Sequence, residues 1–182
     1  MIVLNLKAKV CMSHLLLKPT FDTFSLIEGE VTTFNRFQVD GRIHKDFFDE
    51  AFEKEYSTWG EVRDFFFQVI RGKKTPLNFK FILSLAKDQF ESFLTEHDLT
   101  YRPAEIQGLY LNFRYDGLAL QCITGTSMNT FTMDKSVEKP GTNMSRNSLP
   151  VRSLILIWNN IMMPGSQHHI IISERKILNL QS

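Results

Sequence analysis

The chain has 182 residues, of which 43% are hydrophobic and 16 are phenylalanine, so we expect one domain with a sizeable core, with or without a tail. Its formal net charge of +1 gives no global indication of a protein that binds nucleic acid or a membrane surface. No apolar run approaches the roughly 20 residues of a spanning helix, no signal peptide is recognisable, and two distant cysteines are typical of a reducing compartment, so we predict a cytoplasmic protein without membrane contact.

The first 56 residues predict short elements of both kinds. In chain order we expect strands at 1–6, 21–27 and 31–39, and short helices at 10–17 and 46–56. Glu28-Gly29 predicts a turn or a bulge. Asp40-Gly41 matches the signature of a two-residue hairpin turn, so we expect the third strand to return through residues 42–44.

The clearest predicted helix begins at Thr58, which forms a capping box with Glu61. A single apolar stripe follows at helical spacing, made of Val62, Phe65, Phe66, Val69 and Ile70. Gly72 is placed where a glycine in the left-handed region would end the helix.

The next elements alternate between strand and helix. Residues 77–85 alternate apolar and polar side chains as a strand does, and Asp88 and Glu91 make a second capping box. Residues 106–124 hold Asp116-Gly117 between two alternating runs, which predicts a hairpin with a type I′ turn. In that hairpin Tyr115 would pair with Leu118 and Phe113 with Leu120. A further strand is expected at 128–133 and a closing helix after Asp134.

The order of these elements predicts the fold class. Strands and helices do not alternate strictly, so a wound parallel sheet is disfavoured. We predict an α+β fold, a mainly antiparallel sheet with helices packed on one face, in a single domain at residues 1–139.

The character of the sequence changes at Pro140, and residues 140–182 lack helical or strand periodicity. One interpretation is a disordered or loosely packed tail. The other is a frameshifted C-terminus, because codons shifted by one base can spell a helix-like continuation, A-W-D-E-Y-V-E-K-F-L-A-S. On the second interpretation these residues, including the adjacent pair His168-His169, carry no selected chemistry.

Two groups of basic residues are the candidate ligand contacts. Arg71, Lys73 and Lys74, with Thr75, lie between a predicted helix and a strand, and would meet phosphate or a nucleic-acid backbone. The ordinary interpretation is that they complement the negative end of the helix dipole, and we favour it. The second group belongs to the first hairpin and to the predicted sheet face: Arg36, Arg42, His44, Lys45 and Arg114.

With Tyr110 and Phe34, the second group could form a stacking and charged surface for single-stranded nucleic acid. The ordinary alternative, an exposed and solvated sheet face, is favoured because the net charge is so small.

No familiar catalytic motif is present: the chain lacks G-x-S-x-G, H-E-x-x-H, C-x-x-C and glycine-rich nucleotide fingerprints. Cys122 is predicted on an apolar face, where core packing is favoured over a role as a nucleophile. Acidic residues near the first strands need no cation to explain them, and we predict neither a metal nor a cofactor.

Several segments together resemble a family of small, uncharacterised bacterial proteins of the clostridial Firmicutes type. They are F-D-T-F, E-G-E-V-T-T-F-N-R-F-Q-V-D-G-R, R-G-K-K-T-P-L-N-F-K-F and T-G-T-S-M-N-T-F-T-M-D-K-S. The resemblance covers roughly residues 1–139 and implies a helix that continues past V-E-K with a W-D-containing segment, a pattern from which this sequence departs at Pro140. It implies no activity, ligand or catalytic residue.

Three functional hypotheses follow. The first is a non-enzymatic binding or interaction domain with a basic face for an anionic or nucleic-acid ligand. The second is a small cytoplasmic enzyme without a recognisable motif. The third is a subunit that binds a protein partner, because a truncated last helix would leave apolar surface exposed.

Overall fold

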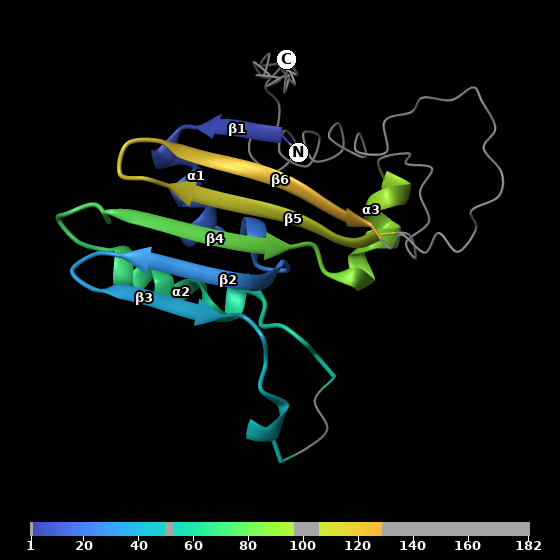
Figure 1. The fold of residues 1–182 in the computed structure, drawn as a ribbon. Helices are drawn as coiled ribbons and strands as arrows, with labels where there is room; N and C mark the ends of the chain where they lie inside the picture. Colours follow the sequence, from blue (N-terminus) through green and yellow to red (C-terminus); the bar gives the residue numbers. More distant parts are fainter. Residues whose placement is uncertain (1, 50–52, 97–105, 129–182) are drawn as a thin grey trace, which may run out of the picture.

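The computed structural model describes residues 2–49, 53–96 and 106–128. One six-stranded sheet organises them (Figure 1). Its strands are β1 (Ile2–Leu6), β2 (Ser25–Thr32), β3 (Arg36–Asp40), β4 (Asn78–Ser84), β5 (Ile106–Tyr115) and β6 (Leu120–Met128). The α-helices are α1 (Ala8–Leu16), α2 (Trp59–Ile70) and α3 (Phe90–Glu96), with 3-10 turns at Pro19–Phe21, Lys45–Phe47 and Lys87–Gln89.

The strand order is β1-β6-β5-β4-β2-β3, and all five pairings are antiparallel. Figure 1 shows α1 and α2 behind the same face of the sheet, α1 near β1 and β6, α2 near β2 and β3. The predicted α+β fold with an antiparallel sheet is therefore confirmed. The opposite face of the sheet is not covered by any of the described helices.

The core lies between the sheet and these two helices. On β4, Phe79, Phe81 and Leu83 are buried and face the helices, as the alternating sequence predicts. The helices contribute Leu15 of α1 and Trp59 and Phe66 of α2, all fully buried. Trp59 stacks on Phe66 at 5.3 Å between ring centroids, and both rings contact Phe81 at 4.9 Å.

Helix α2 begins as predicted. The capping box between Thr58 and Glu61 is present, and the Glu61 carboxylate accepts the Thr58 N–H at 2.7 Å. The helix ends where predicted, with Gly72 directly after the C-cap residue Arg71. The predicted left-handed glycine is wrong, because Arg71 leaves the helix with extended backbone (φ −60°, ψ 132°) and Gly72 does not adopt positive φ. The predicted stripe is narrower than expected, since Phe66 is buried while Phe65 is 47% exposed.

The β5–β6 hairpin is confirmed, but its predicted register is wrong by two residues. Tyr115 pairs with Leu120 and Phe113 with Cys122, so the loop has four residues, 116–119. The Asp116 carboxylate accepts the N–H groups of Leu118 and Ala119, at 3.0 and 2.8 Å, and these bonds stabilise the longer loop. A shift of two residues preserves the side-chain period of a strand, so the predicted apolar face is still the buried one.

The Asp40-Gly41 dipeptide is not a hairpin turn. The turn that joins β2 and β3 is at 33–35, and the Gly41 N–H donates to Ile27 O, so Gly41 continues the β2–β3 pairing beyond Asp40. A Cβ at Gly41 would lie 1.8 Å from Leu26 O, so glycine is needed for close approach of two backbones. The predicted irregularity near Glu28-Gly29 is present as a register shift between Leu26 and Glu28.

Other predicted elements differ from the structure or lie outside it. Residues 45–47 form a 3-10 turn where a helix over 46–56 was expected, and Arg42 and Tyr56 form an isolated antiparallel bridge. The predicted strand at 128–133, apart from Met128, the helix after Asp134 and residues 140–182 lie outside the described residues.

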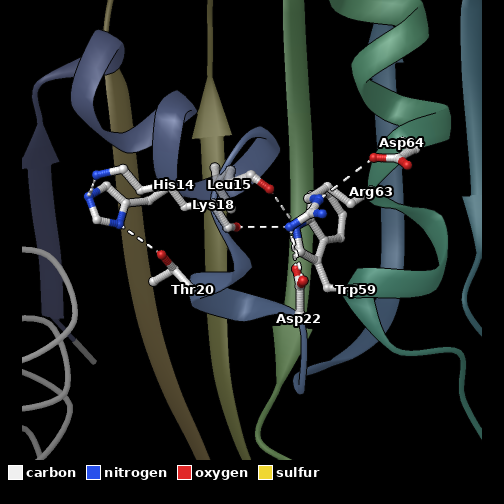
Figure 2. A network of polar contacts seen from close by, with 8 residues as sticks. All are labelled: His14, Leu15, Lys18, Thr20, Asp22, Trp59, Arg63 and Asp64. Atoms are coloured by element: carbon white, nitrogen blue, oxygen red, sulfur yellow. Dashed lines mark hydrogen bonds and ion pairs between the residues drawn. The ribbon is translucent and has the colours of Figure 1, made fainter.

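A polar network joins α2 to the chain around α1 (Figure 2). The Trp59 indole N–H donates to Leu15 O at 2.6 Å within the core. The Arg63 guanidinium donates to both carboxylate oxygens of Asp22, at 2.7 and 3.0 Å, and to Lys18 O at 3.0 Å. These bonds hold the two helices in a fixed relation over the sheet.

His14 is a buried titratable group in the same region (Figure 2). Its Nδ1 lies 2.9 Å from Thr20 Oγ1 and its Nε2 lies 3.2 Å from Lys18 Nζ. Because Lys18 carries only N–H donors, this contact needs a neutral imidazole with Nε2 as the acceptor. Burial, together with the Lys18 charge, lowers the pKa of His14 below its ordinary value of 6.5.

We expect this histidine to make the fold less stable in acid. The unfolded chain takes up the proton near pH 6.5 while the folded chain does not, so the His14 contribution is lost as pH falls below about 6.5. Urea unfolding at pH 7.5 and pH 5.5 should therefore show a smaller acid loss for His14→Gln than for the wild type. His44→Gln, which removes an exposed imidazole, is the control. Equal acid losses for wild type and His14→Gln would contradict this prediction.

Candidate functional site: a groove between α1 and α2

A groove of about 590 Å³ lies on the helix-covered side of the sheet. One wall is α1, with Met12 and Leu16, and the other is the last turn of α2, with Phe67 and Ile70. We call it the interhelical groove. Its volume is within the range of roughly 300–1,000 Å³ of small-molecule sites.

The groove is apolar inside. Phe79 of β4 and Tyr115 of β5 contribute to it from the sheet, and their rings stack at 5.3 Å between centroids. Pro76 closes the end formed by the segment that joins α2 to β4. Ser13, Thr75 and Tyr115 carry the hydroxyl groups among the lining residues, and the Tyr115 hydroxyl donates to Gly117 O at 2.8 Å. An apolar body is therefore the part of a ligand that would be buried here.

The charged residues that line the groove are all lysines. They are Lys9 of α1 and Lys73 and Lys74 of the α2–β4 connection, and all three are exposed. None forms an ion pair with another described residue, and no acidic residue lines the groove. The rim is thus positive around an apolar interior, which favours a ligand with one apolar end and one anionic end.

The dipoles of the two helix ends at the groove favour ligands of opposite charge. The first turn of α1, with Ala8 and Lys9, carries no acidic side chain, and its positive dipole end favours an anion. The last turn of α2 ends at Ile70 with the negative end of its dipole, which favours a cation. Because these contributions oppose each other, the lysine side chains determine the sign of the charge that the rim attracts.

The predicted basic residues are divided between the two sides of the sheet. Lys73 and Lys74 line the interhelical groove, and Arg71 is the exposed residue that ends α2. Arg36 and Arg114 belong instead to the open face, since they alternate with the helix-facing Phe37 and Phe113. The two predicted groups therefore do not form one surface.

The open face is mixed in charge. Arg36 forms an ion pair with Glu30, and Lys80 forms one with Glu28 at 2.8 Å. Arg114 pairs across the strands with Lys80 on one side and Gln121 on the other. Acidic side chains therefore stand among the basic ones, as expected for a solvated sheet face.

The remaining predicted residues are also separated. Arg36 begins β3 and Arg42 lies two residues beyond its end, roughly 20 Å away along an extended chain. His44 follows Arg42 in the exposed connection beyond β3. Phe34, 85% exposed, is in the β2–β3 loop, whereas Tyr110 pairs with Ser84 at the other end of β4. The structure does not bring these two rings together as a stacking surface.

The cysteines are core residues. Cys11 and Cys122 are fully buried free thiols. Burial raises the pKa of Cys11 to about 12 and also raises the pKa of Cys122, so both are protonated at neutral pH and unsuited to nucleophilic attack. Within 2–49, 53–96 and 106–128, no three His, Cys, Asp or Glu side chains gather as a metal site would require.

Lys9 and the whole α1 wall of the groove were not predicted from the sequence. Residues 10–17 do predict a short helix, but nothing local indicates that its Met12 and Leu16 face the segment 72–76. The available signal was the placement of Lys7 and Lys9 in a first turn without acidic residues. It indicates a positive helix end but not what that end faces.

The comparisons with known proteins identify a family. The family model for DUF5721, a family of unknown function, matches residues 14–150, so the chain belongs to this family. This confirms the predicted membership of an uncharacterised family. The match runs to Pro150, beyond Lys139, and the predicted change of reading frame stays a prediction. No curated protein and no solved structure matches the chain.

Of the helices in the described parts of the chain, none has the length and apolar character needed to cross a membrane.

Proposed function

We propose that this chain is a non-enzymatic binding domain whose ligand is an amphipathic anion held in the interhelical groove. The observation that carries the proposal is the lining itself: an apolar interior of about 590 Å³ with three lysines and no acidic residue. The apolar part of the ligand lies between α1 and α2, and its carboxylate or phosphate meets Lys9, Lys73 and Lys74.

The same features favour a small amphipathic anion over nucleic acid. A nucleic-acid surface needs an extended basic track with exposed aromatic rings, and its bases stack on those rings. The three lysines instead border one concave apolar site, and Phe79 at its base is buried. On the open face, Glu28 and Glu30 neutralise Lys80 and Arg36.

Two probes of equal chain length test the proposal: dodecanoate, which carries a charge, and dodecanol, which does not. We expect the wild-type chain to bind both and to prefer dodecanoate. The Lys73→Gln/Lys74→Gln variant should weaken dodecanoate binding by about 2- to 30-fold, if each exposed pair contributes roughly 0.2–1 kcal/mol, and leave dodecanol unchanged. Calorimetry or displacement of a fluorescent fatty acid measures both affinities.

Two further variants locate the site. Ser13→Trp places a large side chain in the groove and should weaken both probes. Arg114→Gln removes an exposed cation from the open face and should change neither. Binding of neither probe by the wild type would overturn the proposal. Tight binding of a single-stranded DNA oligonucleotide would also overturn it, if the Arg114→Gln substitution weakens that binding and dodecanoate does not displace the oligonucleotide.

We also propose that the protein is bacterial and cytoplasmic, and that residues 140–182 result from a changed reading frame. The two free, buried cysteines support a reducing compartment. The loss of periodicity at Pro140 supports the frame change. The coding DNA across the Lys139 codon tests the last point: a base missing or added there supports it, and an intact frame in independent isolates overturns it.

A further inference from the structure

Strand β3 is one edge of the sheet, and its outer side is unpaired among the described strands. Its five residues, Arg36–Asp40, contain neither proline nor lysine, and their register with β2 has no bulge. Proline, lysine and bulges are features that usually protect an edge strand from pairing with another chain; the charges that this short strand does carry, Arg36 and Asp40, are of opposite sign. Arg36, Gln38 and Asp40 are exposed, while Phe37 and Val39 are partly buried on the helix side.

The pairing with β2 determines which backbone groups are free. The Gly41 N–H donates to Ile27 O at 3.2 Å, and the Thr33 N–H donates to Asn35 O at 2.9 Å. Phe37 and Val39 therefore direct their N–H and C=O groups toward β2, since the register is continuous between these two bonds. Arg36, Gln38 and Asp40 direct theirs away from the sheet.

These three residues are self-complementary about Gln38. If a second β3 lies antiparallel to the first with Gln38 opposite Gln38, Arg36 faces Asp40 of the second copy, and Asp40 faces Arg36. All three are residues with outward N–H and C=O groups, so each opposed pair exchanges two hydrogen bonds, six in total. On the helix side, Phe37 would face Val39 of the second copy, an aromatic and β-branched pair that stabilises sheets.

We propose that the chain forms a two-fold symmetric dimer through β3, which joins two six-stranded sheets into one continuous antiparallel sheet. The occupant of the edge is a second copy of this chain, because the charge order Arg36–Gln38–Asp40 is complementary to itself in the antiparallel direction and repels itself in parallel register. A single opposite-charge pair thus occurs twice across the axis, as isologous interfaces require. The interhelical groove is not part of this contact, so the proposed dimer does not depend on whether the groove binds the proposed ligand.

Two charge-reversal variants test this dimer. In Arg36→Asp the edge carries two aspartates, and in Asp40→Arg it carries two arginines, so each variant alone faces like charges in the dimer. We expect both to be monomers, with dimerisation at least about tenfold weaker than in the wild type. An equimolar mixture restores both opposite-charge pairs and should form a heterodimer. Sedimentation equilibrium of the full chain between about 10 µM and 1 mM covers the range expected for a small interface.

The controls separate the dimer contact from folding. Arg114→Asp makes the same charge change on the open face, away from β3, and should dimerise like the wild type. Gln38→Pro removes an N–H that points away from β2, so the sheet within one chain keeps its bonds while the dimer loses a central one. It should be a folded monomer by circular dichroism. A monomeric wild type at 1 mM overturns the proposal, as does a mixture of the two reversed variants that stays monomeric.

Discussion

Replacing Trp59 by alanine is expected to lower the free energy of unfolding by about 3–5 kcal/mol, a large part of the roughly 5–15 kcal/mol that stabilises an ordinary domain. The indole is fully buried at the first position of α2. It stacks on Phe66 at 5.3 Å and lies 4.9 Å from Phe81, so its removal leaves a cavity between α2 and the centre of the sheet. Urea unfolding followed by circular dichroism measures the change without depending on the fluorescence of the mutated residue.

A second substitution at this position separates packing from hydrogen bonding. Trp59→Phe keeps most of the ring contacts but leaves Leu15 O without the indole donor at 2.6 Å. An unsatisfied buried carbonyl costs roughly 1–3 kcal/mol, so the loss should be smaller than for alanine but clearly measurable. Leu118→Ala is the control, because Leu118 is 95% exposed and should change stability by no more than about 0.5 kcal/mol. Equal losses for Leu118→Ala and Trp59→Ala would contradict the core described above.

The Trp59 bond also explains why the groove was harder to predict than the sheet. The alternation of Phe79, Phe81 and Leu83 is a local pattern, and it predicts which side of β4 is buried. The position of α1 relative to α2 depends on contacts 44 residues apart, such as Trp59 to Leu15, for which no local pattern exists. The sequence therefore indicates the two walls as helices but not the groove between them.

The error in the predicted β5–β6 register likewise arises because a local pattern leaves several arrangements possible. For the β5–β6 hairpin, strand alternation alone allows any shift by two residues, and the Asp116 side chain selects the longer loop. Likewise, Arg36 and Arg114 were expected on one side of the sheet and are found on it, but alternation could not show that Glu28 and Glu30 stand among them. Which acidic side chains lie beside which basic ones depends on the order of the strands in the sheet, because β2, which carries the two glutamates, lies between β3 and β4.

Substitution of Gly41 by alanine is expected to lower the free energy of unfolding by about 2–5 kcal/mol. A Cβ there would lie 1.8 Å from Leu26 O and 2.5 Å from Leu26 C, both backbone atoms of β2. The two backbones would have to separate, which also weakens the bonds from Gly41 N–H to Ile27 O and from Ser57 N–H to Gly41 O. Gly72→Ala is the matched control, because no atom lies within 4 Å of the added methyl group. It should stay within about 1 kcal/mol of the wild type.

A third variant distinguishes this close approach from the hairpin turn that Asp40-Gly41 resembles. In a type I′ turn the glycine is needed for positive φ, a conformation that asparagine tolerates, so Gly41→Asn would be mild. In the structure the glycine is needed because there is no room for a Cβ, so Gly41→Asn should be at least as damaging as Gly41→Ala. Thermal and urea unfolding of the three variants decide between the two accounts. An asparagine variant close to wild-type stability would support a hairpin turn at Asp40-Gly41 and contradict the observed path of the chain after β3.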